Sequence, residues 1–135
     1  MKILLDTNVL ISAVVFGGKA KQMIWLLQEK NYEIYVSEYI EQEFKNKLEE
    51  KWPTVSDEAY RLYKSIGFPV LKSTNAKLGD LRDPKDVPVL SDAIQYEVDV
   101  LVTGDKDFLE ADMKRPVILS PAMMFEYLTQ RSKHQ

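Results

Sequence analysis

The sequence contains no cysteine and a single histidine, His134, close to its last residue. The absence of thiols excludes disulfides, cysteine nucleophiles and thiolate zinc ligands. A Ser-His-Asp triad would have to use His134, and zinc or copper sites built on histidine lack their ligands. Glycine and proline are also few, with five and six residues, so a disordered chain is not expected.

Long apolar runs are missing as well. The longest nearly apolar stretch covers residues 9–16 and is interrupted by Ser12, whereas a membrane helix needs ~20 residues. The first residues include an aspartate at position 6 and do not resemble a signal peptide. The phosphate-binding patterns GxxxxGKS/T and GxGxxG are absent too. We therefore expect a soluble, cytoplasmic protein with no membrane partner.

Short apolar runs alternate with segments of helical periodicity across the 135 residues. The predicted strands cover residues 3–5, 33–36, 69–71, 98–102 and 117–119. The predicted helices cover residues 9–16, 20–28, 38–51, 57–66, 86–97, 108–113 and 121–130, with Ser37, Ser56 and Asp86 as N-caps. Residues 73–85 are expected to form a loop and residues 131–135 a mobile tail after a single domain of residues 1–130. This alternation predicts an α/β fold, with a mostly parallel sheet covered by helices on both faces.

Two of the predicted strands are followed closely by an aspartate. Asp6 follows residues 3–5, and Asp105 follows the end of residues 98–102 after two intervening residues. Ligands of open parallel sheets bind at the carboxyl ends of the strands, at a switch point of the topology. These positions predict a carboxylate-lined site, although either aspartate could instead be the N-cap of the helix that follows it.

Two further acids lie on predicted helices. Asp86 opens one helix and, taken alone, is best explained as its N-cap. Glu43 lies in the middle of another helix, but Glu41 lies at least as close to its apolar stripe, so periodicity does not select between them and either could be a surface glutamate. Two strand-end acids joined by one acid from each of two helices would form an oxygen-lined pocket. Such a pocket suits Mg²⁺ or Mn²⁺.

Carboxylates gathered in this way repel one another when no metal is bound. Two of them ~4 Å apart repel by about 4 kcal/mol at an effective dielectric constant of ~20. We therefore predict that some of these acids have raised pKa values without metal, and that a divalent ion stabilises the fold.

Four segments together resemble the PIN domain family, most closely its toxin components of prokaryotic toxin–antitoxin pairs (VapC-like ribonucleases). They are ILLDTNVLISAVVF at 3–16, VSEYIEQEF at 36–44, DPKDVPVLSDAI at 83–94 and VLVTGDKDFL at 100–109. Each is weak alone, but the four occur in the order of the family and span nearly the whole chain. The resemblance implies a three-layer α/β/α fold with a central sheet of about five strands.

The resemblance also implies the residues of the site. Catalytic and metal-binding roles fall on the acids Asp6, Glu43, Asp86 and Asp105, with Asp107 as an additional acid near the metal; this selects Glu43 over Glu41. Polar positions that line such sites, and that we expect to contact the acids rather than the metal, are Thr7, Asn8, Ser37 and Thr103. Two positions depart from the family. Val87 stands where relatives often have an acid or asparagine, and Asp92 stands where a small apolar residue is commoner.

The implied function is an Mg²⁺- or Mn²⁺-dependent endoribonuclease, the toxin of a toxin–antitoxin pair, that forms a homodimer and has an antitoxin protein as partner. The alternatives are a non-catalytic RNA- or protein-binding domain that retains the acidic pocket, and a small Mg²⁺-dependent phosphatase. The net charge of −3 does not decide between them, because carboxylates bound to metal would no longer repel RNA. The candidate RNA-contacting residues near the motifs are Lys19, Lys21, Lys45, Arg82, Lys85 and Lys106.

Overall fold

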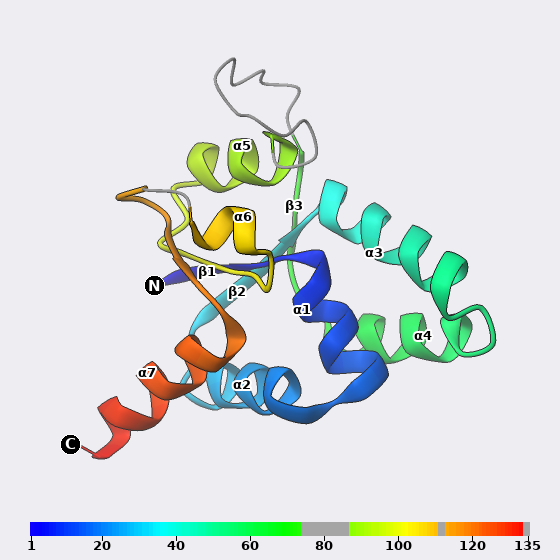
Figure 1. The fold of residues 1–135 in the computed structure, drawn as a ribbon, viewed down its shortest axis with the longest axis horizontal. Helices are drawn as coiled ribbons and strands as arrows, with labels where there is room; N and C mark the ends of the chain where they lie inside the picture. The colour runs from blue at the N-terminus through cyan, green and yellow to red at the C-terminus, as the bar shows by residue number, and fades with distance from the viewer. Residues whose placement is uncertain (74–86, 111–112, 134–135) are drawn as a thin grey trace.

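The structure is a computed structural model that describes residues 1–73, 87–110 and 113–133 (Figure 1). The expected N-cap Asp86 and nearly all of the expected loop at 73–85 lie outside the described residues. The elements follow one another as β1 (Lys2–Leu5), α1 (Thr7–Ile11), η1 (Ser12–Phe16), α2 (Gly18–Glu29), β2 (Glu33–Ser37), α3 (Glu38–Lys51), α4 (Ser56–Ile66), β3 (Val70–Leu71), α5 (Val87–Gln95), β4 (Val100–Val102), α6 (Lys106–Leu109), β5 (Val117–Leu119) and α7 (Pro121–Lys133).

The five strands form one parallel sheet in the order β3-β2-β1-β4-β5. In the centre, Leu4 of β1 is in register with Tyr35 of β2 on one side and Leu101 of β4 on the other. The chain first builds outward from β1 to β3 and then crosses back to β4 and β5, so the topology switches direction between β1 and β4. Because crossovers of parallel strands are right-handed, this reversal places helices on both faces. The predicted α/β/α fold with five strands is confirmed.

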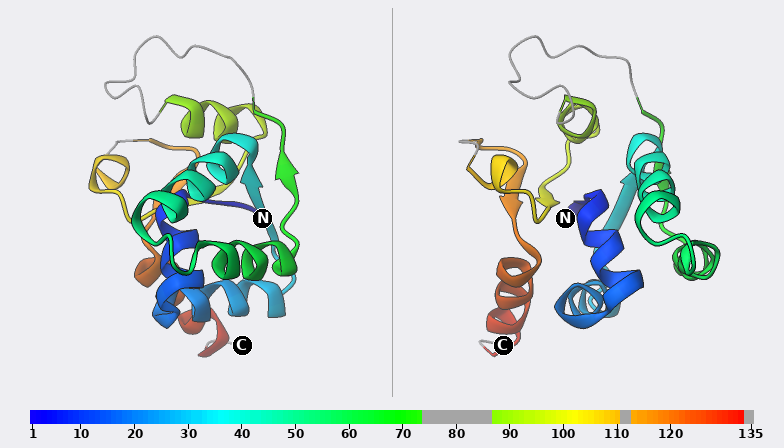
Figure 2. Two further views of the ribbon diagram at one scale, coloured as in Figure 1. Left: turned by 90° about the vertical axis from the view of Figure 1, so that its right-hand side faces the viewer. Right: turned by 45° about the vertical axis from the view of Figure 1, so that its right-hand side comes forward.

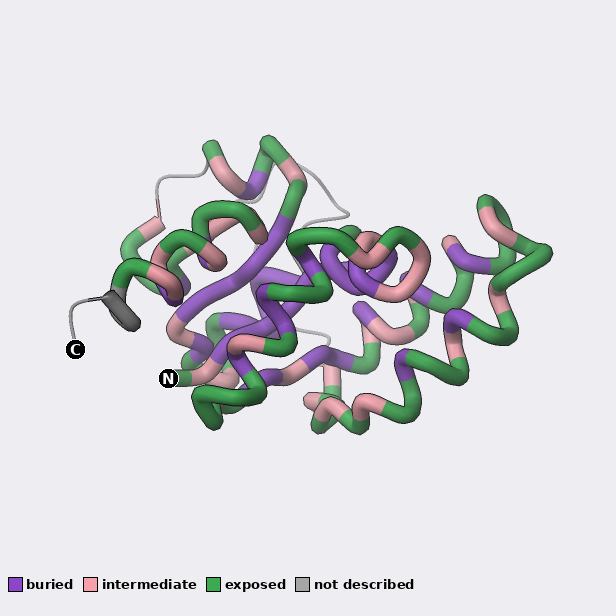
Figure 3. The backbone as a smooth tube through the Cα atoms, turned by 90° about the horizontal axis from the view of Figure 1, so that it is seen from below, coloured by how far each residue is buried: buried purple, intermediate pink, exposed green. Residues whose placement is uncertain are grey.

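The core lies along the central strands. Residues Ile3, Leu4 and Leu5 of β1 and Leu101 of β4 are fully buried. Figure 3 shows that the helices are buried on one stripe and exposed on the other, whereas β1 is buried along most of its length. Strands covered on both faces are expected to be continuously apolar, which explains the short runs ILL and VLV in the sequence. These runs end at the polar residues that follow β1 and β4.

Helices α1, α3 and α4 lie side by side. Figure 2 shows α3 next to α1, and α4 next to α3, from two further directions. On α3, the buried residues Ile40, Phe44 and Leu48 recur every four residues, which gives this helix its apolar stripe. The ring of Phe44 meets the ring of Tyr63 on α4 at a centroid distance of 4.8 Å. The packing of α1, α3 and α4 fixes the position of α3 relative to the end of β1.

The segment from Thr7 to Glu29 is helical but sharply bent. It begins as α1 and widens into the π-helical turn η1, where the sequence predicts one continuous helix over residues 9–16. Gly17, with φ of 79°, separates η1 from α2. Among the described residues no single helix is long and apolar enough to cross a membrane. Within the described ranges, the pair Thr7–Phe16 and Gly18–Glu29 reaches that length and composition when taken together, and its two helices are bent by 105°.

The end of η1 touches the end of α3. The ring of Phe16 packs edge-on against the ring of Trp52, the residue at the C-cap of α3, with 5.8 Å between centroids. This contact joins the far ends of the two helical segments whose near ends lie at the carboxyl ends of β1 and β2.

Several predicted boundaries are wrong. The N-cap of α4 is Val55 rather than Ser56, whose hydroxyl instead donates to the carbonyl of Pro53. The predicted helix over 108–113 is the short helix α6, which ends at Leu109. Compared with the predicted bounds, helix α5 ends two residues earlier, at Gln95, and strand β4 begins two residues later, at Val100. Helix α7 continues past the predicted end at residue 130 to Lys133. These differences lie at the ends of elements, which the local sequence specifies least precisely.

Candidate active site at the carboxyl ends of the strands

Asp6 lies directly after β1, at the switch point of the sheet. Its backbone N–H donates to the carbonyl of Val102 (2.9 Å), so the turn stays attached to β4. Its Oδ1 accepts the backbone N–H of Thr7 and its Oδ2 accepts the hydroxyl of Thr103, both at 2.8 Å. Asp6 is the N-cap of α1 and is only 4% exposed. Asp6 can therefore be a helix cap and a site residue at the same time.

Glu43 reaches the same end of the sheet from α3. Ser37, the last residue of β2, accepts the N–H of Ile40 (3.2 Å) and thereby starts α3 at a fixed point. Glu43 lies about one and a half turns later, on the side facing α1. Its Oε1 accepts the hydroxyl of Thr7, and its Oε2 accepts the hydroxyl of Tyr39 at 3.4 Å. Thr7 therefore links Asp6, through its backbone, to Glu43, through its side chain.

Glu41 points to a different neighbour. Its Oε2 accepts the hydroxyl of Tyr63 (2.7 Å) and pairs with the ammonium group of Lys64 (3.3 Å), both on α4. The bond to Glu41 also raises the pKa of Tyr63, after the larger effect of burial. Glu41 thus connects α3 to α4, whereas Glu43 connects α3 to the residues after β1.

Asp105 joins the group from β4. Thr103, which is fully buried, accepts the backbone N–H of Asp105 (3.0 Å) while donating its own hydroxyl proton to Asp6. Asp105 caps α6, because its Oδ1 accepts the N–H of Asp107 (2.9 Å). Asp107 itself is exposed. Thr103 therefore links Asp6 and Asp105 as Thr7 links Asp6 and Glu43.

The charges of these acids reach one another. Burial raises the pKa of Asp6, and the negative charges of Glu43 and Asp105 raise it further. The hydrogen bonds from Thr103 and Thr7 only partly offset these effects. Among the described residues, neither Asp6, Glu43 nor Asp105 forms an ion pair with a lysine or arginine. The prediction of a raised carboxyl pKa is confirmed for Asp6.

The donor chemistry of this group fits a hard divalent cation. Every side-chain atom of this group that could ligate a metal is an oxygen. The buried charge of Asp6 has no cationic partner in the described part of the chain. The acids are nevertheless not gathered into a finished cage: within residues 1–73, 87–110 and 113–133, no three carboxylate or histidine side chains are close enough to hold one ion. The fourth expected acid, Asp86, lies outside the described residues.

The sequence assigned no role in this site to two nearby residues, Lys47 and Asp92. The ammonium group of Lys47 lies 3.5 Å from Oδ1 of Asn8, the exposed residue after Thr7. Its only sequence signal is its spacing of four residues from Glu43. Asp92 was visible only as a departure from the family: it is fully buried, and its Oδ2 accepts the hydroxyl of Ser73 at 2.8 Å.

Ser73 connects Asp92 to the start of α3. Its hydroxyl oxygen accepts the N–H of Tyr39 (2.9 Å), and its own N–H donates to Glu38 (2.8 Å). Since the hydroxyl of Tyr39 donates to Glu43, the first turn of α3 is held from both sides. A carboxylate is useful at position 92 because it can accept the hydroxyl proton that fixes this arrangement.

The expected RNA-contacting residues are dispersed. Lys19 lies over the ring of Phe125 and Lys45 over the ring of Tyr60, each with the ammonium group 5.7 Å from the ring centroid. Lys21 and Lys106 are exposed, and Lys106 is adjacent in sequence to Asp105. The two remaining candidates, Arg82 and Lys85, lie outside the described residues.

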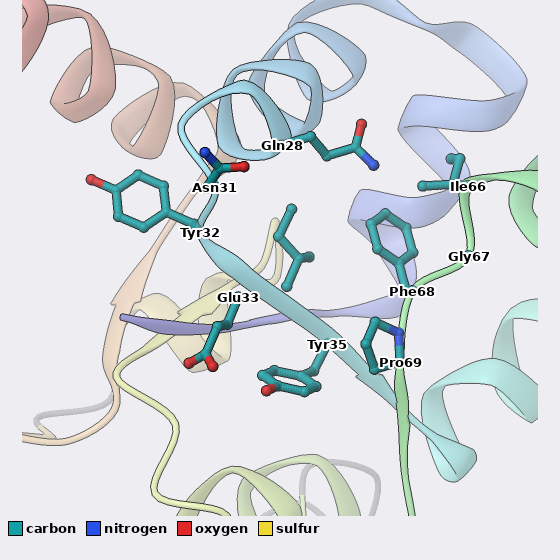
Figure 4. A pocket seen from close by; sticks show the side chains of 10 residues that line it. Gln28, Asn31, Tyr32, Glu33, Tyr35, Ile66, Gly67, Phe68 and Pro69 are labelled. Carbon is teal, nitrogen blue, oxygen red and sulfur yellow. The ribbon is translucent and has the colours of Figure 1, made fainter.

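Among the hollows in the described part of the chain, two with volumes above 300 Å³ lie away from the acids. One, of about 350 Å³, lies at the amino end of β2, where Tyr32, Tyr35 and Phe68 line it (Figure 4). The other, of about 640 Å³, lies between β5 and α7, and Val117 and Tyr127 are among its lining residues. None of the described candidate acids lines either hollow. The acidic group is therefore a separate feature at the opposite end of the sheet from the first hollow.

The fold and the acidic switch point define a class of α/β proteins that bind ligands at the carboxyl ends of parallel strands. Within that class, the PIN domain model matches residues 2–107, and the chain belongs to the PIN domain family, whose members are generally nucleases. A chain of the VapBC2 complex from Rickettsia felis, solved bound to a DNA fragment from its promoter, has the same fold, with a TM-score of 0.69 and 17% identity. The match covers 89% of this chain and 98% of that one. A comparison with curated proteins finds no match.

Proposed function

We propose that this protein is a metal-dependent endoribonuclease that hydrolyses phosphodiester bonds in RNA. The observation that carries this proposal is Asp6, a buried carboxylate whose pKa is raised by burial and by Glu43 and Asp105. Keeping such a charge in the interior is costly unless a cation compensates it. Because the chain belongs to a family whose members are generally nucleases, a cation bound here would serve the hydrolysis of phosphodiester bonds.

The chain's own residues would prepare the reaction. Asp6, Glu43 and Asp105, with Asp86 by its match to the family motif, would bind Mg²⁺ or Mn²⁺. When bound, such an ion lowers the pKa of a coordinated water and offsets the charge that develops on the phosphate. The hydroxyl groups of Thr7 and Thr103 orient the carboxylates of Glu43 and Asp6. The carboxylates position the reactants and do not attack phosphorus themselves.

Cleavage of a fluorescent mixed-sequence single-stranded RNA tests this proposal. The wild-type protein is assayed with Mn²⁺, with Mg²⁺ and with EDTA, beside Asp6→Asn and Asp105→Asn. We expect cleavage that needs the metal and is lost in both variants, while circular dichroism shows that both remain folded. Metal-independent cleavage, or equal cleavage by Asp6→Asn, would refute the proposed role of the acids.

One observation favours a second candidate, an inert binding domain that retains the acids. The described acids are hydrogen-bonded to threonine and tyrosine hydroxyls and do not form a finished metal cage. Metal binding without RNA cleavage would identify this alternative. Hydrolysis of p-nitrophenyl phosphate without RNA cleavage would instead identify a phosphatase, so both substrates belong in the same experiment.

The toxin role is a further part of the proposal. The structural neighbour from Rickettsia felis is a VapBC complex, which supports an antitoxin protein as the partner of this chain. The proposal also includes action on cytoplasmic RNA as a homodimer. Induced expression in a bacterial host should arrest growth, and Asp6→Asn should relieve the arrest. If expression of neither the wild type nor Asp6→Asn slows growth, the toxin role is refuted, even if the wild type cleaves RNA in vitro. Sedimentation of the purified protein tests the dimer.

A further inference from the structure

We propose that Lys47 binds an RNA phosphate next to the one that is cleaved. This inference rests on the proposed ribonuclease function and adds a residue that contacts the substrate. It starts from the position of Lys47 on α3, one turn after Glu43. Side chains four residues apart on a helix lie on the same face, so Lys47 follows Glu43 along the side of α3 that faces α1.

The contact with Asn8 places the ammonium group beside the acids. Its Nζ lies 3.5 Å from Oδ1 of Asn8. Asn8 follows Thr7, whose backbone binds Asp6 and whose hydroxyl binds Glu43. Asn8 is exposed and Lys47 is partly buried, so the pair lies at the surface edge of the acidic group. A substrate phosphate near the acids would pass close to this cation.

The ordinary structural explanation of a lysine at this spacing is a helix salt bridge. A glutamate four residues before a lysine is the favourable order for such a pair. In the described part of the chain, however, the only ion pairs are Lys64 with Glu41 and Arg115 with Asp99. Both carboxylate oxygens of Glu43 accept hydroxyl groups instead. The charge of Lys47 is therefore not neutralised by its neighbour on the helix.

The interaction that Lys47 does make is easily replaced. At 3.5 Å, its bond to a neutral amide oxygen is at the long limit of hydrogen bonding. A phosphate oxygen carries negative charge and forms shorter, stronger bonds with an ammonium group. A cation at this edge would also offset the repulsion between the acids and the RNA backbone. These properties suit a phosphate contact better than a contact that stabilises the fold.

Lys45 provides the matched comparison on the same helix. It lies two residues earlier and faces α4, where its ammonium group covers the ring of Tyr60. Lys45 was among the RNA contacts predicted from the sequence, and Lys47 was not. In the structure, however, Lys45 points toward α4 and away from Glu43. A test of position, rather than of charge alone, can therefore compare the two lysines.

The experiment measures binding and cleavage of one fluorescent single-stranded RNA by the wild type, Lys47→Gln, Lys47→Arg and Lys45→Gln. Binding is followed by anisotropy in EDTA at several salt concentrations, and cleavage with Mn²⁺ over a range of RNA concentrations. We expect Lys47→Gln to reduce the slope of log K against log salt by about 0.7, the value for one phosphate contact with a single strand. Its KM for the RNA should rise by a larger factor than its rate at saturating RNA falls. Lys47→Arg should retain most of the slope.

The outcomes separate this inference from the proposed function. Equal slopes for the wild type and Lys47→Gln, or an equal loss in Lys45→Gln, would overturn the role of Lys47 even if the wild type cleaves RNA. Failure of the wild type to bind the RNA would also overturn it. Binding that depends on Lys47 without any cleavage would support the phosphate contact and refute the nuclease. Thermal melts of all four proteins, expected to coincide, exclude misfolding as the cause.

Discussion

Asp6 and Asp99 are the same residue type at opposite ends of neighbouring strands, and their surroundings differ in kind. Asp6 follows β1 and is buried, and both its oxygens accept uncharged donors. Asp99 precedes β4 with its side chain 39% exposed, accepts the N–H of Lys2 at 2.8 Å and pairs with Arg115 at 3.1 Å. The bond from Lys2 and the charge of Arg115 lower the pKa of Asp99, whereas burial raises that of Asp6.

The difference fits a structural charge at Asp99 and the proposed metal-binding charge at Asp6. At the amino end of the sheet, the chain itself supplies the donors and the cation that Asp99 needs. At the carboxyl end, no lysine or arginine among the described residues pairs with Asp6, and burial together with the charges of Glu43 and Asp105 raises its pKa. The two ends can be compared directly by making the same substitution at each.

The largest expected difference is in catalysis. Asp6→Asn should lower the rate of RNA cleavage by more than about 100-fold, beyond what the loss of an outer partner of a metal ligand usually costs. Asp99→Asn should leave the rate within about twofold, because its partners are the chain's own backbone and Arg115. Single-turnover cleavage with Mn²⁺ measures both. Equal losses in the two variants would remove the distinction between the ends of the sheet.

The next effect is the response of stability to metal. Mn²⁺ at about 100 times its dissociation constant should stabilise the wild type and Asp99→Asn by about 2.7 kcal/mol. Asp6→Asn should gain much less, because one carboxylate charge of the proposed site is gone. Urea unfolding followed by circular dichroism, with Mn²⁺ and with EDTA, gives these differences. A similar gain in all three proteins would mean that the metal binds elsewhere.

A smaller effect should follow the loss of a single neighbour at each end. Thr103→Val removes the hydroxyl that orients Asp6 and keeps the side-chain shape, so cleavage should fall by about 10- to 100-fold. At the other end, Arg115→Gln removes the cation beside Asp99 and should not change cleavage. Metal titrations followed by thermal melting should show weaker binding in Thr103→Val only. Unchanged cleavage in Thr103→Val would mean that its hydroxyl serves the fold alone.

The smallest effect, with opposite signs at the two ends, is on stability without metal. Because the folded pKa of Asp6 is raised, its favourable contribution is complete below its unfolded pKa and is lost as pH rises through the folded value. Asp6→Asn should therefore be more stable than wild type at pH 7, and the gain should shrink toward pH 4.

Asp99 has the reverse dependence, because its folded pKa is lowered. Its contribution is present above the usual aspartate pKa and is lost as pH falls through the lowered value. Asp99→Asn should cost less than about 1 kcal/mol at pH 7, since the pair is largely exposed. Urea unfolding in EDTA at pH 7 and pH 4 tests both variants. Destabilisation by both at pH 7 would contradict the comparison.

Much of the fold was predictable because local and tertiary preferences agree. The buried strands β1 and β4 are short apolar runs that end at polar residues, and Ser37 is both a good N-cap and the last residue of a strand. Ser56 shows where this fails. Its hydroxyl has an alternative acceptor in the carbonyl of Pro53, so an equally plausible cap residue does not cap. Likewise, no local pattern distinguishes the π-helical turn from a continuous α-helix.

The candidate site was only partly predictable. The strand-end positions of Asp6 and Asp105 follow from the order of elements, but the choice of Glu43 over Glu41 needed the family resemblance. In the structure, this choice reflects which face of α3 meets α1 and which meets α4. Lys47 and Asn8 are 39 positions apart, so their contact depends on the packing of α1 against α3, which periodicity does not specify.

Because Phe16 packs against Trp52, the fluorescence of Trp52 can report on the position of the helical segment that ends at Phe16. The chain has two tryptophans, and Trp25 on α2 is 60% exposed. Trp52 packs against the end of the segment that begins beside Asp6, and it ends the helix that carries Glu43. With Trp25→Phe as background, the emission of Trp52 would follow the separation of these two segments in real time, without a label.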